Sequence, residues 1–296
     1  MRYRYVTCDV FTERRFGGNQ LAVLPDAEGL DAAQMQAIAA EFNYSETTFV
    51  LPPSESRHLA RVRIFTPRYE MPFAGHPTVG TALVLAWLGR VPDAGEFVLE
   101  ELAGPVPVRL RPAGSGVAFA EFAAPQRPTH DAPVPAAPLA AALRLDLSDL
   151  MTAGGLPCVA GCGTPFLLVE LASLGALGRA AVAAGTELPT GVTGVHLFTR
   201  DTGDDAVDLR ARMFAPSAGV AEDPATGSAA AALAGFLGGL PGLPDGWHGW
   251  RIAQGIEMGR PSLIETRARR ERGEVQEVRV GGAAVRVAEG TIEVDG

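Results

Sequence analysis

Two short blocks, half the chain apart, combine residue types suited to holding a substrate and moving a proton. HPTVGTA at 76–82 matches DPATGSA at 223–229, so both share a titratable residue, Pro-x-x-Gly, a hydroxyl residue and Ala. Each block runs into a largely apolar stretch typical of a buried helix. N–H groups at a helix start lack intrahelical acceptors and attract anions. The first-turn residues expected to hold a substrate carboxylate are Gly80, Thr81, Gly227 and Ser228.

The same blocks also suit a purely structural role. Glycines at these positions allow close helix packing, and hydroxyls of Ser and Thr often bond back to a helix carbonyl. For Asp223, capping the helix is a sufficient role, although its carboxylate also suits a substrate amine or hydroxyl or a proton relay. His76 is an uncommon cap and suits a bond to a substrate or to a second carboxylate. Because the two blocks are alike, we favour a ligand site.

Glu46 is the predicted acid/base. It lies in NYSETTFV at 43–50, where a helical pattern ends and a strand-like pattern begins, and an offset of about 149 residues places it opposite apolar Val195. A carboxyl group partly desolvated in a cleft between two lobes has a raised pKa suited to proton transfer. An exposed glutamate that caps a turn is the alternative. Asn19, in GGNQ, suits either a substrate contact or a tight glycine turn.

An internal repeat predicts the scaffold that positions these residues. RIFTP at 63–67 returns as RMFAP at 212–216, 149 residues later, and the two chemical blocks are 147 residues apart. A weaker pair, at 18–23 and 163–168, has an offset of 145 residues. Three blocks in one order at nearly one offset predict two topologically equivalent lobes.

The chain therefore divides into lobes at 1–128 and 129–296, joined by a proline-rich linker, and the extreme C-terminus is expected to pack back on the first lobe. We predict an α+β fold of two pseudo-symmetric lobes, each with strands around a central helix. Pro77 and Pro224 are expected at the first helical positions, after capping residues His76 and Asp223.

Further elements follow from local patterns. Asp31 and Gln34 form a capping box that starts another helix. Alternation and β-branched residues predict strands at 4–10, 21–24, 47–51, 60–65, 116–122, 165–171, 194–198 and 206–214. The C-terminal runs at 262–266, 274–280, 283–287 and 291–294 suggest a meander of hairpins.

Composition narrows the function. A net charge of −9 argues against nucleic acid or an anionic membrane as partner, and no apolar run is long enough for a membrane span. The chain has no lysine, which excludes a lysine Schiff base and a P-loop lysine. Cys8, Cys158 and Cys162 form no CxxC motif, which suits a reducing compartment. Cys158 and Cys162 suit either a metal or redox pair or two small buried residues.

Several motifs, in order along the chain, resemble the phenazine biosynthesis PhzF-like family. They are DVFT with GGNQLAV, SETTFV, RIFTP with PFAGHPTVGTA, FAP with EDPATGSA, and QGIEMGRPS. The resemblance implies the diaminopimelate epimerase fold, with a mixed barrel-like sheet around a central helix in each lobe. It also implies a homodimer that works without cofactor, and Glu46 as the group that moves the proton. The cysteine usage leads us to expect a cytoplasmic protein, and the scattered histidines, none in a metal-ligand spacing, lead us to expect no metal.

The resemblance further implies which residues contact the substrate: Asn19, Gly75, His76, Asp223, Thr226, Gly227 and Ser228. The characterised family reaction is isomerisation of trans-2,3-dihydro-3-hydroxyanthranilate. Related epimerases use two cysteines at the two helix starts, where this chain has none. We expect an isomerase acting on a small carboxylate-bearing substrate. The alternatives are an epimerase or lyase on an amino-acid-like substrate, and a non-catalytic carboxylate-binding protein.

Overall fold

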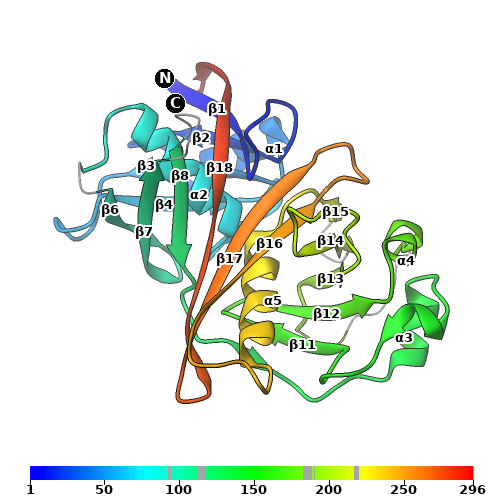
Figure 1. Cartoon of the computed structure of the whole chain (residues 1–296). Coiled ribbons are helices and arrows are strands. Elements are labelled where there is room, and N and C mark those ends of the chain that lie inside the picture. The colour runs from blue at the N-terminus through cyan, green and yellow to red at the C-terminus, as the bar shows by residue number, and fades with distance from the viewer. Residues whose placement is uncertain (93–94, 113–117, 183–188, 190, 217–219, 296) are drawn as a thin grey trace. The chain divides into compact units, whose positions relative to one another are not determined.

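The computed structural model describes residues 1–295 except 93–94, 113–117, 183–188, 190 and 217–219 (Figure 1). The chain forms two compact units, the first made of Met1–Pro125 with Gly281–Gly296 and the second of Gln126–Val280. The predicted α+β class is confirmed. None of the helices within the described residues has the length and apolar character needed to cross a membrane.

Unit 1 is a mixed sheet with two helices. Its strands are β1 (Arg2–Val10), β2 (Asn19–Leu24), β3 (Glu46–Leu51), β4 (Ala60–Phe65), β5 (Glu70–Met71), β6 (Glu96–Glu101), β7 (Gly104–Pro112), β8 (Ala118–Ala123) and the later part of β18 (Glu274–Glu293). Its helices are α1 (Ala32–Phe42) and α2 (Gly75–Trp87). The expected strand at 116–122 falls partly outside the described residues.

The strands of unit 1 form a closed ring. Neighbours pair in the order β1, β2, β3, β4, β6, β7 and β8, and β18 pairs with both β8 and β1 to complete the closed 8-strand barrel. Helix α2 contacts β1, β2, β3 and β8. Residues 75–85 of α2 are all buried, because the helix is apolar or small on every side. The barrel therefore fixes α2 from several directions.

Unit 2 repeats the same strand order. Its strands are β9 (Thr129–His130), β10 (Leu150–Met151), β11 (Cys158–Gly161), β12 (Pro165–Leu171), β13 (Gly194–Thr199), β14 (Leu209–Ala215), β15 (Val220–Asp223), β16 (Gly246–Gln254), β17 (Ser262–Glu271) and the start of β18. Its helices are α3 (Ala136–Ala142), the 3₁₀ turn η1 (Leu147–Asp149), α4 (Leu174–Arg179) and α5 (Gly227–Gly239).

Strand directions in the two units agree pair by pair. β2 and β3 run parallel, β3 and β4 antiparallel, and β4 and β6 parallel, and the pairs β12–β13, β13–β14 and β14–β16 have the same directions. Helix α5 contacts β11, β12, β16 and β17, and Figure 1 shows it in yellow beside β16 and β17. The internal repeat in the sequence is thus a repeat of topology.

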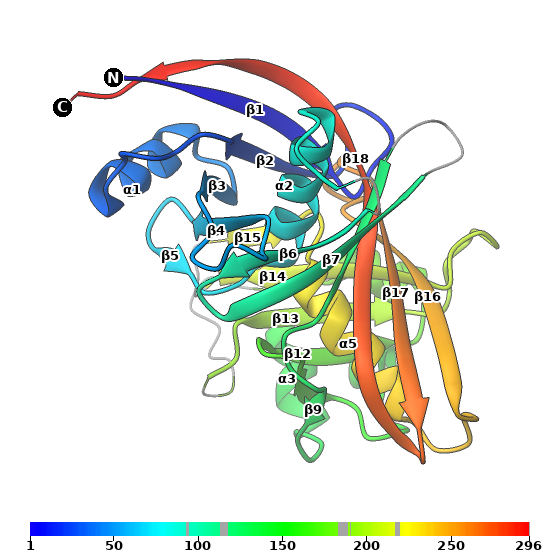
Figure 2. The same ribbon diagram turned by 90° about the vertical axis from the view of Figure 1, so that its left-hand side faces the viewer.

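The predicted strand at 262–266 lies in β17, but the prediction of separate hairpin strands at 274–280, 283–287 and 291–294 is wrong, because residues 274–293 form the single strand β18. Figure 2 shows β18 as one long red ribbon that lies beside β1 near its end. The Gly281–Gly282 pair looks like a turn in the sequence. In the structure a Cβ on Gly281 would lie 2.7 Å from the carbonyl oxygen of Ala120. The glycine therefore allows close approach to β8 instead of reversing the chain.

Both helix starts also differ from the expectation. Helix α2 begins at Gly75 after the N-cap Ala74, so Pro77 occupies its third position and His76 its second. Proline is tolerated there because an N–H in the first turn has no intrahelical acceptor. Helix α5 begins later, at Gly227 after the N-cap Thr226, so Pro224 and Asp223 precede the helix.

Candidate active site

Strand β3 and helix α2 position the first group of predicted residues, all within unit 1. Phe49 and Leu51 pack with α1 in an outer cluster of buried residues. Since side chains alternate along a strand, Glu46 and Thr48 point to the other face, toward α2. The hydroxyl oxygens of Thr48 and Thr81 accordingly lie 2.8 Å apart in the buried space between β3 and α2.

Glu46 and His76 meet at the start of α2. The Oε2 atom of Glu46 lies 3.4 Å from Nε2 of His76, and their side chains are 14% and 4% exposed. This distance is slightly longer than a standard hydrogen bond. Polar contacts in the sites of free enzymes commonly shorten when substrate binds. The positive end of the helix also favours a carboxylate at this position. A carboxyl group and an imidazole are therefore held together at a helix start.

Burial favours the neutral form of the His76 imidazole. Burial lowers the pKa of His76 to about 3, while a hydrogen bond with the backbone of Gln20 acts in the opposite direction. The side-chain amide nitrogen of Asn19, at the start of β2, lies 3.3 Å from Nδ1 of His76. Asn19 is itself 1% exposed. Both ring nitrogens of His76 thus face defined polar groups, and the ring is fixed beside Glu46.

A hydrogen-bonded turn precedes α5 in unit 2. The Thr226 hydroxyl donates to Oδ2 of Asp223 at 2.5 Å, and the amide of Gln254 donates to the Asp223 carbonyl at 2.8 Å. The N–H of Thr226 donates to Oε1 of Gln254 at 3.3 Å, and the Ser262 hydroxyl donates to the Pro224 carbonyl at 2.9 Å. These bonds hold residues 223–226 outside the helix, which explains why α5 starts only at Gly227.

The first turn of α5 carries potential donors. Its leading N–H groups, from Gly227 and Ser228, have no intrahelical acceptor by helix geometry, and the N–H of Ala230 is the one that bonds back to the Thr226 carbonyl at 3.0 Å. The prediction that Gly227 and Ser228 lie in a first helical turn is confirmed. This turn, beside the buried Asp223 carboxyl, suits an anionic or polar ligand group.

The corresponding prediction for Gly80 and Thr81 is wrong. Because α2 begins at Gly75, these two residues lie in its second turn, where their N–H groups serve the helix. A Cβ on Gly80 would lie 2.5 Å from a methyl of Leu21 and 2.7 Å from a methyl of Val10. Gly80 is a packing position between α2 and the barrel. The first-turn residues of α2 are instead Gly75 and His76.

The strand register corrects the position matched with Glu46. Thr47 pairs with Phe65, and Val195 pairs with Phe214, the residue that Phe65 matches in the repeat. Glu46 therefore corresponds to Gly194, one residue before Val195. A Cβ on Gly194 would lie 2.6 Å from the Phe214 carbonyl oxygen, so unit 2 leaves no room for a side chain there. At this strand position, unit 1 therefore carries a carboxyl side chain and unit 2 carries none.

Comparison with known proteins gives a consistent answer. The family model for phenazine biosynthesis-like proteins, PhzC-PhzF, matches residues 8–290. The chain belongs to this family. An uncharacterized isomerase of Mesorhizobium japonicum is 43% identical, covering 97% of this chain and 98% of its own length. The trans-2,3-dihydro-3-hydroxyanthranilate isomerase of Pseudomonas aeruginosa is 37% identical, with coverage of 97% and 98%.

Solved structures support the same family assignment. The Bacillus anthracis phenazine biosynthesis protein of the PhzF family has a TM-score of 0.90 at 25% identity, covering 99% of this chain and all of the other. A predicted epimerase of Pseudomonas aeruginosa has a TM-score of 0.82 at 33% identity, with coverage of 99% and 100%. This PhzF-family member is an enzyme, an isomerase. The alternative of a non-catalytic carboxylate-binding protein is therefore wrong.

The cysteines of this family member are buried thiols. Burial raises the pKa of Cys158 to about 11 and that of Cys162 to about 12, and Cys8 is also free and buried. The Cys162 thiol donates to the Ala231 carbonyl at 3.4 Å. Protonated, buried thiols are poor nucleophiles and poor metal ligands. Within the described ranges, no group of three or more His, Cys, Asp and Glu side chains suits a metal ion.

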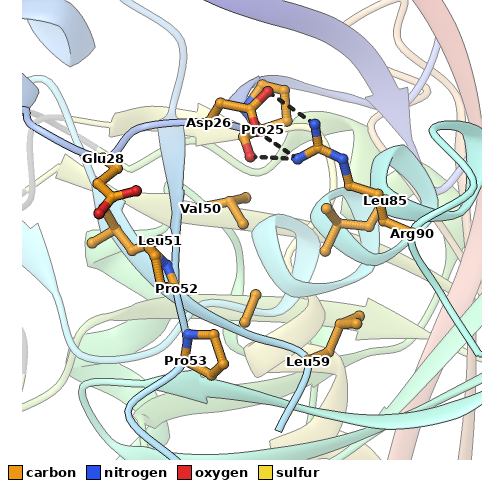
Figure 3. Close-up of a pocket in the computed structure, with 11 residues that line it drawn as sticks. Pro25, Asp26, Glu28, Val50, Leu51, Pro52, Pro53, Leu59, Leu85 and Arg90 are labelled. Atoms are coloured by element: carbon orange, nitrogen blue, oxygen red, sulfur yellow. Dashed lines mark hydrogen bonds and ion pairs between the residues drawn. The ribbon is translucent and has the colours of Figure 1, made fainter. Parts of the chain in front are cut away.

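A separate cavity of about 260 Å³ lies in unit 1, near the C-terminal end of α2 (Figure 3). Its walls are mostly apolar, including Val50, Leu51 and Leu85, and its rim carries Asp26 and Arg90. The guanidinium of Arg90 donates to both Asp26 carboxylate oxygens, at 2.8 and 2.9 Å. None of the predicted site residues lines this cavity, and Glu28 adds a second carboxyl group to its lining.

Sequence reasoning missed the residues that support the site. Gln254 and Ser262, which hold the turn before α5, lie in the QGIEMGRPS motif that helped to carry the family resemblance. This motif was the sequence signal for Gln254 and Ser262. Its local pattern does not show which turn the two residues hold. Thr48, which bonds to Thr81, is the other missed residue, and it lies in SETTF two positions after Glu46.

Proposed function

We propose that this isomerase moves a proton within a small carboxylate-bearing ring or amino-acid-like substrate, of the kind named for its Pseudomonas relatives. The observation that supports this most is the carboxyl group of Glu46, 3.4 Å from the neutral His76 at the start of α2. A carboxyl group held beside a fixed imidazole in a largely buried position is a suitable acid/base.

In the proposed reaction, Glu46 removes a proton from one substrate carbon while the electron pair shifts along the conjugated system. The carboxylic acid so formed returns the proton to a second carbon on the same face. His76, neutral and held by Asn19, orients the Glu46 carboxyl or a substrate group through its second nitrogen. Every proton removed is returned, so the step needs no oxidant or reductant.

The α5 start is proposed to hold the substrate. Its amides at Gly227 and Ser228 and the Ser228 hydroxyl suit a carboxylate, because they form a donor set at the positive end of a helix. Asp223, with its Thr226 bond, suits an amine or a hydroxyl. A cofactor-free reaction, a homodimer and a cytoplasmic location complete the proposal.

The test is incubation with trans-2,3-dihydro-3-hydroxyanthranilate in D₂O, followed by ultraviolet absorbance and mass spectrometry. We expect a change in absorbance as the double bonds move, with deuterium incorporation to the extent that the Glu46 proton exchanges with solvent. Glu46→Gln is the matched control and should lose both signals. Turnover of this substrate by Glu46→Gln at the wild-type rate would contradict the role of Glu46, and no turnover by the wild type would remove this substrate.

Epimerisation is the second candidate, since a relative of known structure with 33% identity is described as a predicted epimerase. Inversion at one carbon requires groups on opposite faces, and Asp223 is proposed as the second acid/base for that reaction. In D₂O an epimerase labels the inverted carbon and leaves the double bonds in place. A lyase would release water or another fragment, which mass spectrometry detects directly.

A further inference from the structure

A second carboxyl group lies close to the start of α2 and has no part in the chemistry above. Glu101, the last residue of β6, is 6% exposed. Its Oε1 atom lies 2.6 Å from the Thr78 hydroxyl oxygen. Among the described residues, its Oε2 atom is buried and has no hydrogen-bond partner. A buried carboxylate with one oxygen unsatisfied would be costly, so its protonation state needs an explanation.

The hydrogen atoms around Thr78 provide that explanation. The Thr78 hydroxyl oxygen lies 2.7 Å from the Ala74 carbonyl oxygen as well as 2.6 Å from Glu101. A hydroxyl has a single hydrogen to donate, and a carbonyl oxygen has none. If Thr78 donates to Ala74, the short contact with Glu101 requires a hydrogen on Glu101. The complete chain is then the Glu101 acid donating to Thr78, and Thr78 donating to Ala74.

The surroundings of Glu101 support a neutral acid. Burial raises the pKa of Glu101 to about 8, and the Thr78 hydrogen bond only partly opposes this. On neighbouring β4, Arg63 is bound to Glu70 by two hydrogen bonds and Arg61 is exposed.

Charged groups on β6, β7 and α2 have other partners. Glu100 points to the opposite face of β6 and accepts from His58. On β7, Arg109 pairs with Glu96 and Arg111 with Glu121. His76 on α2 is neutral, as described above. No cation in the described part of the chain is recorded within ion-pair distance of Glu101.

This hydrogen-bond chain reaches the part of α2 that carries the site. Ala74 is the N-cap of α2 and has no side-chain capping bond. Gly75 and His76 lie between Ala74 and Thr78, so bonds that fix both ends of this segment also fix His76. Ionised Glu101 would compete with the Ala74 carbonyl for the one hydroxyl hydrogen of Thr78 and loosen the turn.

We propose that Glu101 is held as a protonated carboxylic acid and positions the first turn of α2, acting on His76 through Thr78 and Ala74. Its effect on catalysis rests on the proposed function, whereas its protonation does not. Glu101 is therefore a positioning residue and not a catalytic one.

The direct test is infrared difference spectroscopy of the full-length protein at pH 7, comparing wild type with Glu101→Gln. We expect the wild type to show a protonated-carboxyl band that is absent in the variant. Glu100→Gln is the matched control on the same strand. Burial raises the pKa of Glu100, but hydrogen bonds from the N–H groups of Ser54 and Glu55 and from His58 outweigh it and hold the value at about 2. Absence of a band assignable to Glu101 would overturn the proposal.

The functional test compares conservative and truncating variants. Gln at position 101 is neutral and can donate to Thr78, so kcat/KM should stay within about twofold of wild type. Glu101→Ala and Thr78→Val break the chain and should each lower kcat/KM about tenfold, the effect of about one buried hydrogen bond. Equal losses in Glu101→Gln and Glu101→Ala would overturn the positioning role.

Stability against pH gives a result that does not need the enzyme's substrate. The pKa of Glu101 is raised in the folded state, so its stabilisation is complete below the unfolded value of 4.5 and is lost as pH rises through about 8. As pH rises from 5 to 8, the wild type should therefore lose stability that Glu101→Gln keeps, so the unfolding midpoint of the variant should rise relative to that of wild type. A constant difference over this range would contradict protonation, even if no substrate is turned over.

Discussion

The starts of α2 and α5 share one sequence pattern but differ in what the structure does with it. In unit 1 the helix begins before the pattern, so His76 lies inside the first turn and faces Glu46. In unit 2 the helix begins inside the pattern, and Asp223 stays outside it, bonded to Thr226. The same residues of the repeat thus enter a helix in one unit and form a turn in the other.

The strand beside each helix differs in the same way. Unit 1 carries Glu46 and Thr48 where unit 2 carries Gly194 and His196, so the proposed acid/base carboxyl of unit 1 has no counterpart in unit 2. Unit 1 joins a carboxyl group to an imidazole, and unit 2 presents amides, hydroxyls and a bonded carboxyl group. The proposed function therefore assigns proton transfer to unit 1 and substrate binding to unit 2, because the two tasks require different side chains.

The largest expected effect tests this separation of tasks. Glu46→Gln should lower kcat by about 10²–10⁴-fold with KM nearly unchanged, because an acid/base acts on the transition state. Ser228→Ala should instead raise KM, by about 10–100-fold if its hydroxyl bonds a carboxylate, with a smaller change in kcat. Steady-state kinetics with the substrate of the proposed reaction measure both. A matching change in kcat for both variants would contradict the separation.

The second effect concerns the buried histidines, one in each unit. Burial lowers the pKa of His76 to about 3 and that of His196 to about 4, below the usual 6.5. The unfolded chain then binds more protons below pH 6.5, so stability is present above that pH and is lost as pH falls. At pH 5 each histidine should cost about 2 kcal/mol of unfolding free energy relative to pH 7.5.

His196→Leu isolates one of these contributions. In the described chain neither ring nitrogen of His196 has a hydrogen-bond partner, so leucine should be neutral or stabilising at pH 7.5. Denaturant unfolding at pH 7.5 and pH 5 should show a smaller acid loss in the variant than in wild type, by about 2 kcal/mol. His130→Asn, on exposed β9, is the control and should keep the wild-type loss. An unchanged loss in His196→Leu would show that His196 already binds a proton at pH 5.

These comparisons show which parts of the fold were accessible from sequence. The α1 capping box of Asp31 and Gln34 was correct because its partners are three residues apart. The start of α5 was wrong because Gln254 and Ser262, about 30 to 40 residues downstream, hold residues 223–226 out of the helix. The break expected between the runs at 274–280 and 283–287 is absent, because Gly281 allows close approach to Ala120, which is distant in sequence.

Within the site, the sequence identified the types of residues better than their positions. Glu46 and His76 were both selected, and the structure brings them to 3.4 Å from each other. Gly80 was selected for its likeness to Gly227, yet it packs against Leu21 and Val10. Likeness between repeats cannot separate a packing glycine from a ligand-binding one, because both roles require the absence of a side chain.

Gly80 provides the third test, on stability. A methyl at this position would overlap side chains of Leu21 and Val10 in a closely packed core, so Gly80→Ala should lower the unfolding free energy by about 1–3 kcal/mol. Gly239→Ala, at the end of α5, is the control, because a Cβ there has no atom within 4 Å. It should be neutral or stabilising by up to about 1 kcal/mol. Equal stability of the two variants would mean that Gly80 is not a packing position.

The smallest effect concerns the hydroxyl pair that only unit 1 has. Thr48 and Thr81 are both fully buried with their oxygens 2.8 Å apart, so Thr48→Val or Thr81→Val should each cost about 1–3 kcal/mol by leaving one hydroxyl unpaired. The double variant should recover about 1 kcal/mol of that sum.

The matching positions in unit 2 are His196 and Ser228, and a double-mutant cycle of His196→Leu with Ser228→Ala should show a coupling energy of less than about 0.5 kcal/mol. Equal coupling in the two cycles would mean that both strands bind their helices alike, and the difference between the units would then be confined to Glu46.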